Sequence, residues 1–167
     1  MAPIGVRQAR EADVGTVSEI LREAAAWLDA RGETLWRMNE LANDSVRREV
    51  RDGMFWIAER GGEAVGVVRF QLEDPLMWPD AGTSDAAYVH RLAVRRSAAG
   101  GGVSRALLDF AVNHTRELGR RLLRLDCEAG RPRLRAIYER YGFAHHSDRR
   151  VGLYRIARYE LPVARSD

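Results

Sequence analysis

The stretch that most constrains this chain runs from Ala87 to Leu108, where an alternating strand leads into three consecutive glycines and then into an amphipathic helix. Glycine lets the backbone adopt conformations that are closed to residues with a Cβ, and it lets a ligand approach closely. A helix that begins directly after such a turn directs several unsatisfied N–H groups and the positive end of its dipole at one point. The stretch therefore predicts a binding site for a phosphate.

The period of two divides the strand between two faces. The residues Tyr88, His90, Leu92 and Val94 fall on one face, and the residues Val89, Arg91 and Ala93 fall on the other. A helical stripe then follows the glycines, and Gly119 is placed as its C-terminal stop. We expect one strand, one glycine turn and one helix from this stretch.

Two known phosphate-binding motifs do not fit these glycines. A P-loop needs a lysine after its last glycine, and the chain contains no lysine. A Rossmann fingerprint needs a third glycine at the position where Arg105 stands. The absence of lysine also excludes a lysine nucleophile and a Schiff-base lysine.

The glycine stretch resembles the acetyl-CoA signature of the GNAT superfamily of N-acetyltransferases, which is Q/R-x-x-G-x-G/A after a strand. Leu92-Ala93-Val94 is similar to the L-x-V of the family's central strand, and the signature falls on residues 99–104. Ala99 replaces the family's Gln or Arg, and Ser104 replaces its Gly or Ala. The resemblance implies that acetyl-CoA is held by Leu92, Ala93, Val94, Ala99, Gly100, Gly101, Gly102, Val103, Ser104 and Arg105.

A second segment, Ala136 to Phe143, is similar to the family's A-x-x-Y-E-K-x-G-F. Tyr138 occupies the position of the tyrosine that hydrogen-bonds the sulfur of CoA, which implies a cofactor contact and a catalytic acid for the leaving thiolate. The alternative is a helix tyrosine that packs on the sheet. Arg131 stands where the family commonly has an asparagine that touches the cofactor, so the resemblance implies a contact from Arg131 as well.

Acetylation of an amine also requires a base, because the amine must lose a proton before it attacks the thioester. His90 stands on the central strand at a position where relatives often have a glutamate base, and an imidazole titrates near neutrality. The alternative is a strand histidine hydrogen-bonded to a neighbour. The resemblance implies that a backbone N–H near Val94 holds the oxyanion.

Other reactive residue types give weaker signals. Cys127 ends a strand and is interpreted as a small buried hydrophobic residue rather than a nucleophile. His114, His145 and His146 lack metal-ligand spacing with acidic or cysteine partners, so no metal site is predicted. Scattered arginine pairs are typical of a solvated surface rather than of a nucleic-acid interface.

The remaining patterns predict strands at 3–9, 54–59, 64–71, 121–126, 143–146 and 151–161, with helices at 11–30, 43–50 and 132–141. Patterning alone supports an α+β fold. The resemblance implies the three-layer GNAT fold, in which a mixed, mostly antiparallel central sheet is flanked by helices on both faces. A length of 167 residues predicts a single domain over residues 1–167.

Two regions outside the signature bear on the acceptor. The loop from Glu73 to Asp85 carries four carboxylates, and it is either a solvated loop or a region that attracts a cationic amine. In the family the first-helix region forms one wall of the acceptor site. Trp27, Trp36 and Met38 are therefore either residues of an acceptor pocket or ordinary packing residues.

The resemblance implies an N-acetyltransferase that moves the acetyl group of acetyl-CoA directly to a primary amine in a ternary complex. A small-molecule acceptor is favoured over a peptide or protein, and the alternative is a non-catalytic acyl-CoA-binding sensor or structural relative. No apolar run approaches the length of a membrane span, so no membrane is expected. The single cysteine favours the cytoplasm. Nucleic acid is not expected as a partner, and the oligomeric state is expected to be a monomer or homodimer.

Overall fold

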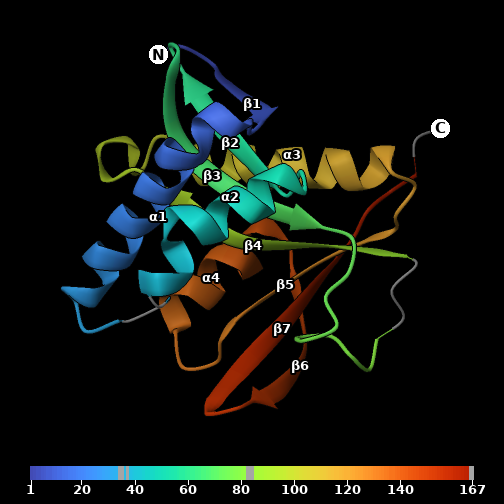
Figure 1. Cartoon of the computed structure of the whole chain (residues 1–167). Helices are drawn as coiled ribbons and strands as arrows, with labels where there is room; N and C mark the ends of the chain where they lie inside the picture. The colour runs from blue at the N-terminus through green and yellow to red at the C-terminus, as the bar shows by residue number, and fades with distance from the viewer. Residues whose placement is uncertain (34–35, 37, 82–84, 166–167) are drawn as a thin grey trace. The chain divides into compact units, whose positions relative to one another are not determined.

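The computed structural model describes residues 1–33, 36, 38–81 and 85–165 (Figure 1). Its helices and strands are, in chain order, β1 (Ile4–Gln8), α1 (Val14–Asp29), α2 (Asn43–Arg51), β2 (Phe55–Arg60), β3 (Glu63–Gln71), β4 (Ala86–Val94), α3 (Val103–Glu117), β5 (Leu122–Glu128), α4 (Pro132–Tyr141), β6 (Ala144–Val151) and β7 (Tyr154–Pro162). Short 3₁₀ turns lie at Glu11–Asp13, Met38–Leu41 and Arg96–Ala98. The predicted order of helices and strands is confirmed.

Within the described residues the strands form a seven-stranded sheet in the order β1-β2-β3-β4-β5-β7-β6. The pairs β1–β2, β2–β3, β5–β7 and β6–β7 are antiparallel, whereas β4 and β5 are parallel. The sheet is therefore mixed and mostly antiparallel, and the predicted α+β class is confirmed.

The last hairpin differs from its prediction. β6 continues to Val151 instead of ending near residue 146, and β7 begins at Tyr154 instead of at residue 151. Gly152 lies in the turn with a φ of 58°. β6 lies at the end of the sheet, and none of its residues is buried. It therefore carries charged side chains such as Asp148 and Arg149 and shows no apolar alternation in the sequence.

The chain divides into two compact units, which are described one at a time. The first unit comprises Met1–Phe70 and Arg91–Phe110, and the second comprises Gln71–His90 and Ala111–Asp167. The expectation of a single domain stays a prediction.

The core of the first unit joins the apolar stripe of α1 to the inner residues of β2. Val17, Ile20 and Leu21 are fully buried on α1, and they belong to the same cluster as Phe55 and Ile57. Helices α1 and α2 lie side by side and are seen in blue and cyan (Figure 1). Burial of an apolar side chain of this size stabilises the folded state by about 1.5–3 kcal/mol relative to leaving it exposed.

Gly66 on β3 allows the start of α3 to approach the strand closely. A Cβ built on Gly66 would lie 2.7 Å from Cγ1 of Val103, 3.2 Å from Cδ1 of Leu107 and 3.0 Å from the carbonyl oxygen of Ala93. The first turn of α3 can therefore lie this close to β3 only because residue 66 has no side chain.

We expect Gly66→Ala to lower the free energy of unfolding by about 1–3 kcal/mol, because the added methyl overpacks this contact. Gly15→Ala is the matched control, since Gly15 lies in α1 and a Cβ added there would meet nothing within 4 Å. That control should stabilise the chain by about 0.5–1 kcal/mol. Urea unfolding measures both, and a neutral Gly66→Ala would contradict the close packing of α3.

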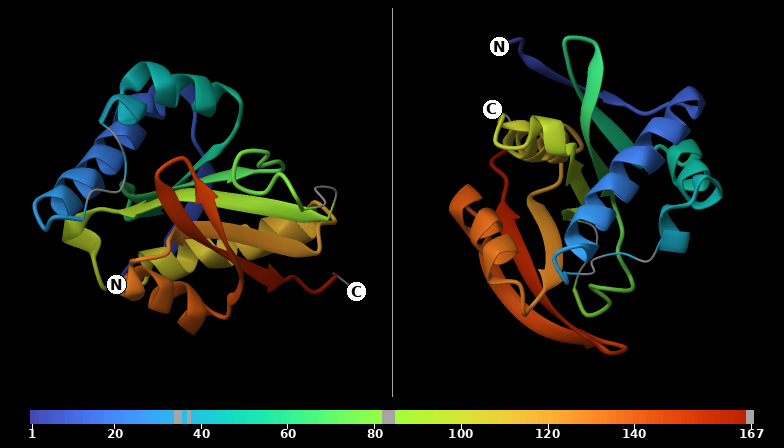
Figure 2. Two further views of the ribbon diagram at one scale, coloured as in Figure 1. Left: turned by 90° about the horizontal axis from the view of Figure 1, so that it is seen from below. Right: turned by 90° about the vertical axis from the view of Figure 1, so that its left-hand side faces the viewer.

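The second unit contains β5, β7, β6 and α4, and Figure 2 shows α4 in orange beside the red strand β7. The contact includes Arg135 of α4, whose Nε donates to Oη of Tyr159 at 2.8 Å. Tyr159 in turn donates to Glu139 at 2.6 Å, so two residues of the helix are held to the strand. Over the described residues, no helix has both the length and the apolar character that a membrane crossing requires.

Candidate active site

The glycine turn of the first unit has the backbone that its sequence predicts. Gly100 and Gly102 have φ values of 77° and 81°, in the left-handed region that favours glycine. The N–H of Ala106 donates to the carbonyl oxygen of Gly102 at 3.0 Å, which is a bond of the first helical turn. The N–H groups that precede this bond open the N-terminus of α3.

Among the three glycines of the turn, Gly101 is the one at which an added Cβ would meet close neighbours. A Cβ on Gly101 would lie 2.9 Å from Nη1 of Arg60 and 3.1 Å from the carbonyl oxygen of Ala98. The Arg60 guanidinium also donates to the Gly101 carbonyl oxygen. Arg60 of β2 therefore braces the turn from one side and brings a positive charge to it, a contact that no sequence signal indicates.

The open side of the turn fits an anionic group such as the pyrophosphate of CoA. Ala99, Gly100 and Gly102 are exposed, and a Cβ added at either of these glycines would meet nothing within 4 Å. Ser104 is half-buried and Arg105 is 77% exposed in the first turn of α3, where the dipole favours negative charge. The cradle thus combines space, N–H donors and positive charge.

The strand before the cradle departs from regular alternation. Arg91 has a φ of 52°, the left-handed region that a non-glycine residue rarely adopts. A period of two cannot be counted across such a residue, so the uninterrupted alternation expected from His90 to Leu92 is wrong at this point. Ala93 is buried in the core of the first unit, and Leu92 and Val94 are half-buried. Their contacts with a cofactor stay predictions.

Arg131 caps the start of α4 in the second unit. Its Nε lies 2.9 Å from Oε2 of Glu128, and its side chain is 13% exposed. A guanidinium at the N-terminus of α4 lies where the dipole also favours anions. The predicted contact of Arg131 with the cofactor stays a prediction.

Tyr138 lies on α4 and is 8% exposed, so its side chain is buried. Its ring packs against Phe143 and Tyr159, with centroid distances of 6.1 and 6.4 Å. Burial raises the pKa of Tyr138, and the nearby groups Cys127 and Asp126 raise it further. The hydroxyl therefore stays protonated at neutral pH, which is the state that a proton donor requires.

Cys127 is the single cysteine of the chain, and it is buried on β5. Burial raises the pKa of its thiol to about 11, with a further contribution from the charge of Asp126. A thiol in this state is a poor nucleophile. The interpretation of Cys127 as a buried hydrophobic residue agrees with this environment.

His90 lies between two carboxylates of the second unit. Its Nε2 is 2.8 Å from Oδ2 of Asp74, and its Nδ1 is 3.7 Å from Oδ2 of Asp126. The three side chains are at most 14% exposed. His90 is thus both a candidate base and a hydrogen-bonded histidine, so the two alternatives raised by the sequence describe the same residue.

Asp74 and Asp126 were not identified from the sequence. Asp74 lay within a stretch of four carboxylates, and nothing in the sequence distinguished it from the other three. The position of Asp126 beside His90 follows from the parallel register of β4 and β5. Tyr88 pairs with Arg124, and two residues further along the two strands lie His90 and Asp126. That register becomes visible only in the folded structure.

The acidic loop is held firmly in the second unit by Trp78. The Trp78 ring is fully buried, and the guanidinium carbons of Arg124 and Arg158 each lie 4.8 Å from its centroid. Arg158 also holds Asp80 through two bonds of 2.6 and 3.1 Å, which lower the pKa of the Asp80 carboxyl. Asp74 and Trp78 are therefore buried, whereas Pro75, Leu76, Pro79 and Asp80 of the same loop are exposed to solvent.

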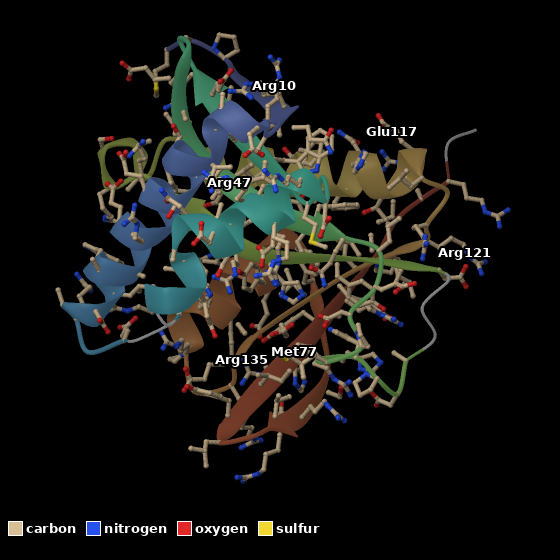
Figure 3. The ribbon with its side chains drawn as sticks, viewed as in Figure 1. Arg10, Arg47, Met77, Glu117, Arg121 and Arg135 are labelled. Atoms are coloured by element: carbon tan, nitrogen blue, oxygen red, sulfur yellow. The ribbon has the colours of Figure 1, made fainter. Side chains whose placement is uncertain are left out.

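The carbonyl oxygen of Met77 accepts a hydrogen bond from Nη1 of Arg158 at 3.2 Å, and Figure 3 labels Met77 on this loop. Asp85, at the end of the loop, lies 3.0 Å from Nη2 of Arg121. Gly82, which the sequence counts in this loop, lies outside the described residues. The carboxylates at positions 74, 80 and 85 all contact specific side chains, so the acidic loop is not a diffuse negative patch.

The residues expected to line an acceptor pocket, Trp27, Trp36 and Met38, belong to the first unit. Trp27 is 36% exposed, and Arg96 and Arg31 lie over its ring at 3.8 and 4.6 Å from the centroid. Trp36 packs against the core of this unit, 5.7 Å from the guanidinium of Arg91. The Met38 side chain lies outside the described part of the chain. A role for these residues in acceptor binding stays a prediction.

Asp74, His90 and Asp126 are also residue types that bind metal ions, and their ligand atoms lie within 4.8 Å of one another. The prediction of no metal site depended on the other three histidines and did not include this group. An ion can bind only one nitrogen of the ring, however, and the two carboxylates lie at different ring nitrogens. The three groups therefore form a chain through both ring nitrogens, and one nitrogen of His90 with one oxygen from each carboxylate is also a set of ligands that an ion could use.

Comparison with known proteins gives consistent matches. The model of the acetyltransferase (GNAT) family matches residues 17–143. YesJ, an uncharacterised N-acetyltransferase of Bacillus subtilis (strain 168), is 28% identical over 137 residues, which cover 78% of this chain and 76% of that protein.

Two solved structures share the fold. A GNAT-family acetyltransferase from Listeria monocytogenes 4b F2365 has a TM-score of 0.81 at 22% identity, over 97% of this chain and 98% of that one. The structure of yncA, a putative acetyltransferase from Salmonella typhimurium with its cofactor acetyl-CoA, has a TM-score of 0.73 at 17% identity, over 99% and 97% of the two chains. These likenesses show that the shared fold covers nearly the whole length of the chain.

Proposed function

Because the chain belongs to the GNAT acetyltransferase family, we propose that it transfers the acetyl group of acetyl-CoA directly to a primary amine, with both substrates bound together. The observation that carries the proposal is the exposed glycine turn at the N-terminus of α3, with left-handed backbone at Gly100 and Gly102. A small-molecule acceptor is favoured. The single free cysteine supports work in a reducing compartment such as the cytoplasm.

The cradle residues Ala99 to Arg105 hold the pyrophosphate through backbone N–H groups and the helix dipole. Ala99 lacks the long polar side chain of the family signature. The guanidinium of Arg60, which donates to the Gly101 carbonyl oxygen, supplies positive charge at the turn. Acetyl-CoA brings the thioester that the amine attacks. A backbone N–H near Val94 holds the developing oxyanion.

Two side chains handle protons in this proposal. His90 accepts a proton from the acceptor ammonium, and the carboxylates of Asp74 and Asp126 lie at its two ring nitrogens. Tyr138 donates to the leaving thiolate, since burial keeps its hydroxyl protonated. The remaining alternative, a non-catalytic acyl-CoA binder, would need neither role.

A thiol-release assay tests the proposed function. The purified chain is incubated with acetyl-CoA and separate panels of small amines, amino acids, aminoglycosides and peptides, and free CoA is measured against acceptor-free reactions. Acceptor-dependent release together with an acetylated product by mass spectrometry supports the enzyme. Acetyl-CoA binding without turnover on any panel supports the non-catalytic alternative, and the absence of binding contradicts both.

Tyr138→Phe should lower turnover by about 10²-fold, the lower end of the range for a general acid, while the Kd for acetyl-CoA changes little. The reason is that thiolate charge develops mainly in the transition state. Tyr159→Phe is the matched control, because it removes a neighbouring hydroxyl that binds Glu139 and Arg135 instead. An unchanged turnover in Tyr138→Phe, with chemistry rate-limiting, would remove the acid role.

A further inference from the structure

His90 has a carboxylate beside each of its two ring nitrogens, Asp74 at Nε2 and Asp126 at Nδ1. A base needs no more than one free nitrogen, so the two carboxylates require their own explanation. We propose that Asp74 orients His90 and that Asp126 supplies negative charge beside Nδ1, so that the ring takes its proton at Nδ1 from a cationic acceptor. The inference rests on the proposed function for the chemistry of the acceptor. It assigns Asp74 as a positioning residue and Asp126 as a residue that selects for positive charge.

The Asp74 carboxylate is fixed before it meets the histidine. Its Oδ1 accepts the N–H of Met77 at 3.1 Å, and its backbone carbonyl accepts the N–H of Trp78 at 2.9 Å. The buried Trp78 ring, which contacts the guanidinium groups of Arg124 and Arg158, holds this turn in place. With Oδ1 occupied, Oδ2 is directed at Nε2 of His90 at 2.8 Å.

This contact selects one tautomer of the neutral ring. An ionised carboxylate can only accept a hydrogen bond, so Nε2 must carry the proton in the contact with Asp74. The lone pair of the neutral ring then lies on Nδ1. Nδ1 is therefore the nitrogen of His90 that can accept a proton.

Asp126 lies beside that nitrogen. Strand β5 brings its Oδ2 to 3.7 Å from Nδ1, which is too long for a good hydrogen bond but close enough for strong charge interaction. A negative charge there attracts an ammonium group to Nδ1. Among the described residues, Asp74 from the loop and Asp126 from β5 are the charged groups that pair with the ring.

The proposed step balances. One N–H bond of the acceptor ammonium breaks, and an Nδ1–H bond forms on His90. The freed lone pair of the amine forms the C–N bond to the acetyl carbon, and the C–S bond breaks with its electron pair leaving on the thiolate. The new amide nitrogen loses its second proton to solvent, and the thiolate takes a proton from Tyr138, which solvent then reprotonates. No oxidant or reductant is needed.

Long-range ¹H–¹⁵N spectra of protein labelled with ¹⁵N-histidine test the orientation without any turnover. The chain has four histidines, and a His90→Gln spectrum assigns the signals of His90. At a pH where the ring is neutral, the parent should show the Nε2–H tautomer. In Asp74→Asn the new amide can donate to Nε2, so the proton should move to Nδ1, beside the carboxylate of Asp126.

Kinetics test the consequence. Asp74→Asn should lower kcat/KM by at least about tenfold and at most about 10⁴-fold, because the ring then presents the wrong tautomer. Asp80→Asn is the matched control, since it alters a hydrogen-bonded carboxylate of the same loop that contacts Arg158 instead of His90. The control should stay within about twofold of the parent, because it leaves the bond between Asp74 and His90 in place.

Asp126→Asn should raise KM for a cationic amine by about fivefold or more while KM for acetyl-CoA stays unchanged, because one negative charge near the ammonium is removed. Prior dialysis against EDTA should leave the parent's activity unchanged. Loss of activity on chelation with recovery on added Zn²⁺ would overturn the proposal in favour of a metal site.

Two further results would also overturn it: the same tautomer in the parent and in Asp74→Asn, or an equal kinetic loss in Asp74→Asn and Asp80→Asn. Failure of the proposed function would give a different set of results. If no amine is acetylated but the tautomer changes as expected, the orientation of His90 by Asp74 stands and the acetyltransferase assignment fails.

Discussion

Gly102→Asp is expected to abolish the stabilisation of the fold by acetyl-CoA and, with it, the transfer activity. Gly102 has a φ of 81°, and a Cβ added there would meet nothing within 4 Å, so an aspartate side chain would enter the open side of the cradle. Its carboxylate would then occupy the N-terminus of α3 and repel the pyrophosphate. The parent should gain about 2.7 kcal/mol at one hundred times Kd, whereas Gly102→Asp should gain nothing measurable.

Gly102→Asn is the matched control for this change. Asparagine tolerates the left-handed region and has nearly the same shape as aspartate, but it carries no charge. A thermal melt with and without acetyl-CoA should show a reduced shift for Gly102→Asn and no shift for Gly102→Asp. Equal shifts in the parent and in Gly102→Asp would mean that the phosphates bind elsewhere.

His90→Gln is expected to lower kcat/KM by at least about tenfold, because a general base typically contributes about 10²- to 10⁴-fold. Glutamine can still donate to Asp74, which limits the damage to the loop, but its amide cannot take up a proton near neutral pH. The acidic limb of the pH–rate profile should therefore move or flatten.

The melting shift produced by acetyl-CoA serves as the control for His90→Gln, because it should match the parent if only the chemistry is impaired. A loss smaller than tenfold with the acidic limb intact would mean that another group or bulk water takes the proton. His90 would then have a structural role through its bond to Asp74.

The order of elements and the cradle were predictable because they depend on local signals. The glycine turn, the helical stripe after it and the alternation of β2 and β3 are each written in fewer than 20 consecutive residues. The C-terminal hairpin was predicted only in part, because β6 carries charges on its exposed positions and offers little apolar alternation.

The surroundings of His90 were not predictable in the same way. Asp74 reaches it from a loop 16 residues away in sequence, and Asp126 reaches it through the register of a parallel strand pair. Arg60 meets the glycine turn from 41 residues away. Such contacts depend on tertiary packing, and neither periodicity nor motif spacing encodes them. The positive φ of Arg91 likewise shows no trace in the sequence, since arginine gives no turn signal.

The burial of Cys127 has a practical consequence for work with this protein. A thiol whose pKa is raised to about 11 is almost wholly unionised at pH 8, and thiol-selective reagents attack the thiolate. Folded protein should therefore contribute almost no background when released CoA is titrated with a chromogenic disulfide. Conversely, a reagent can label Cys127 only when β5 opens. The labelling rate of this single cysteine therefore measures the rate of local unfolding in the second unit.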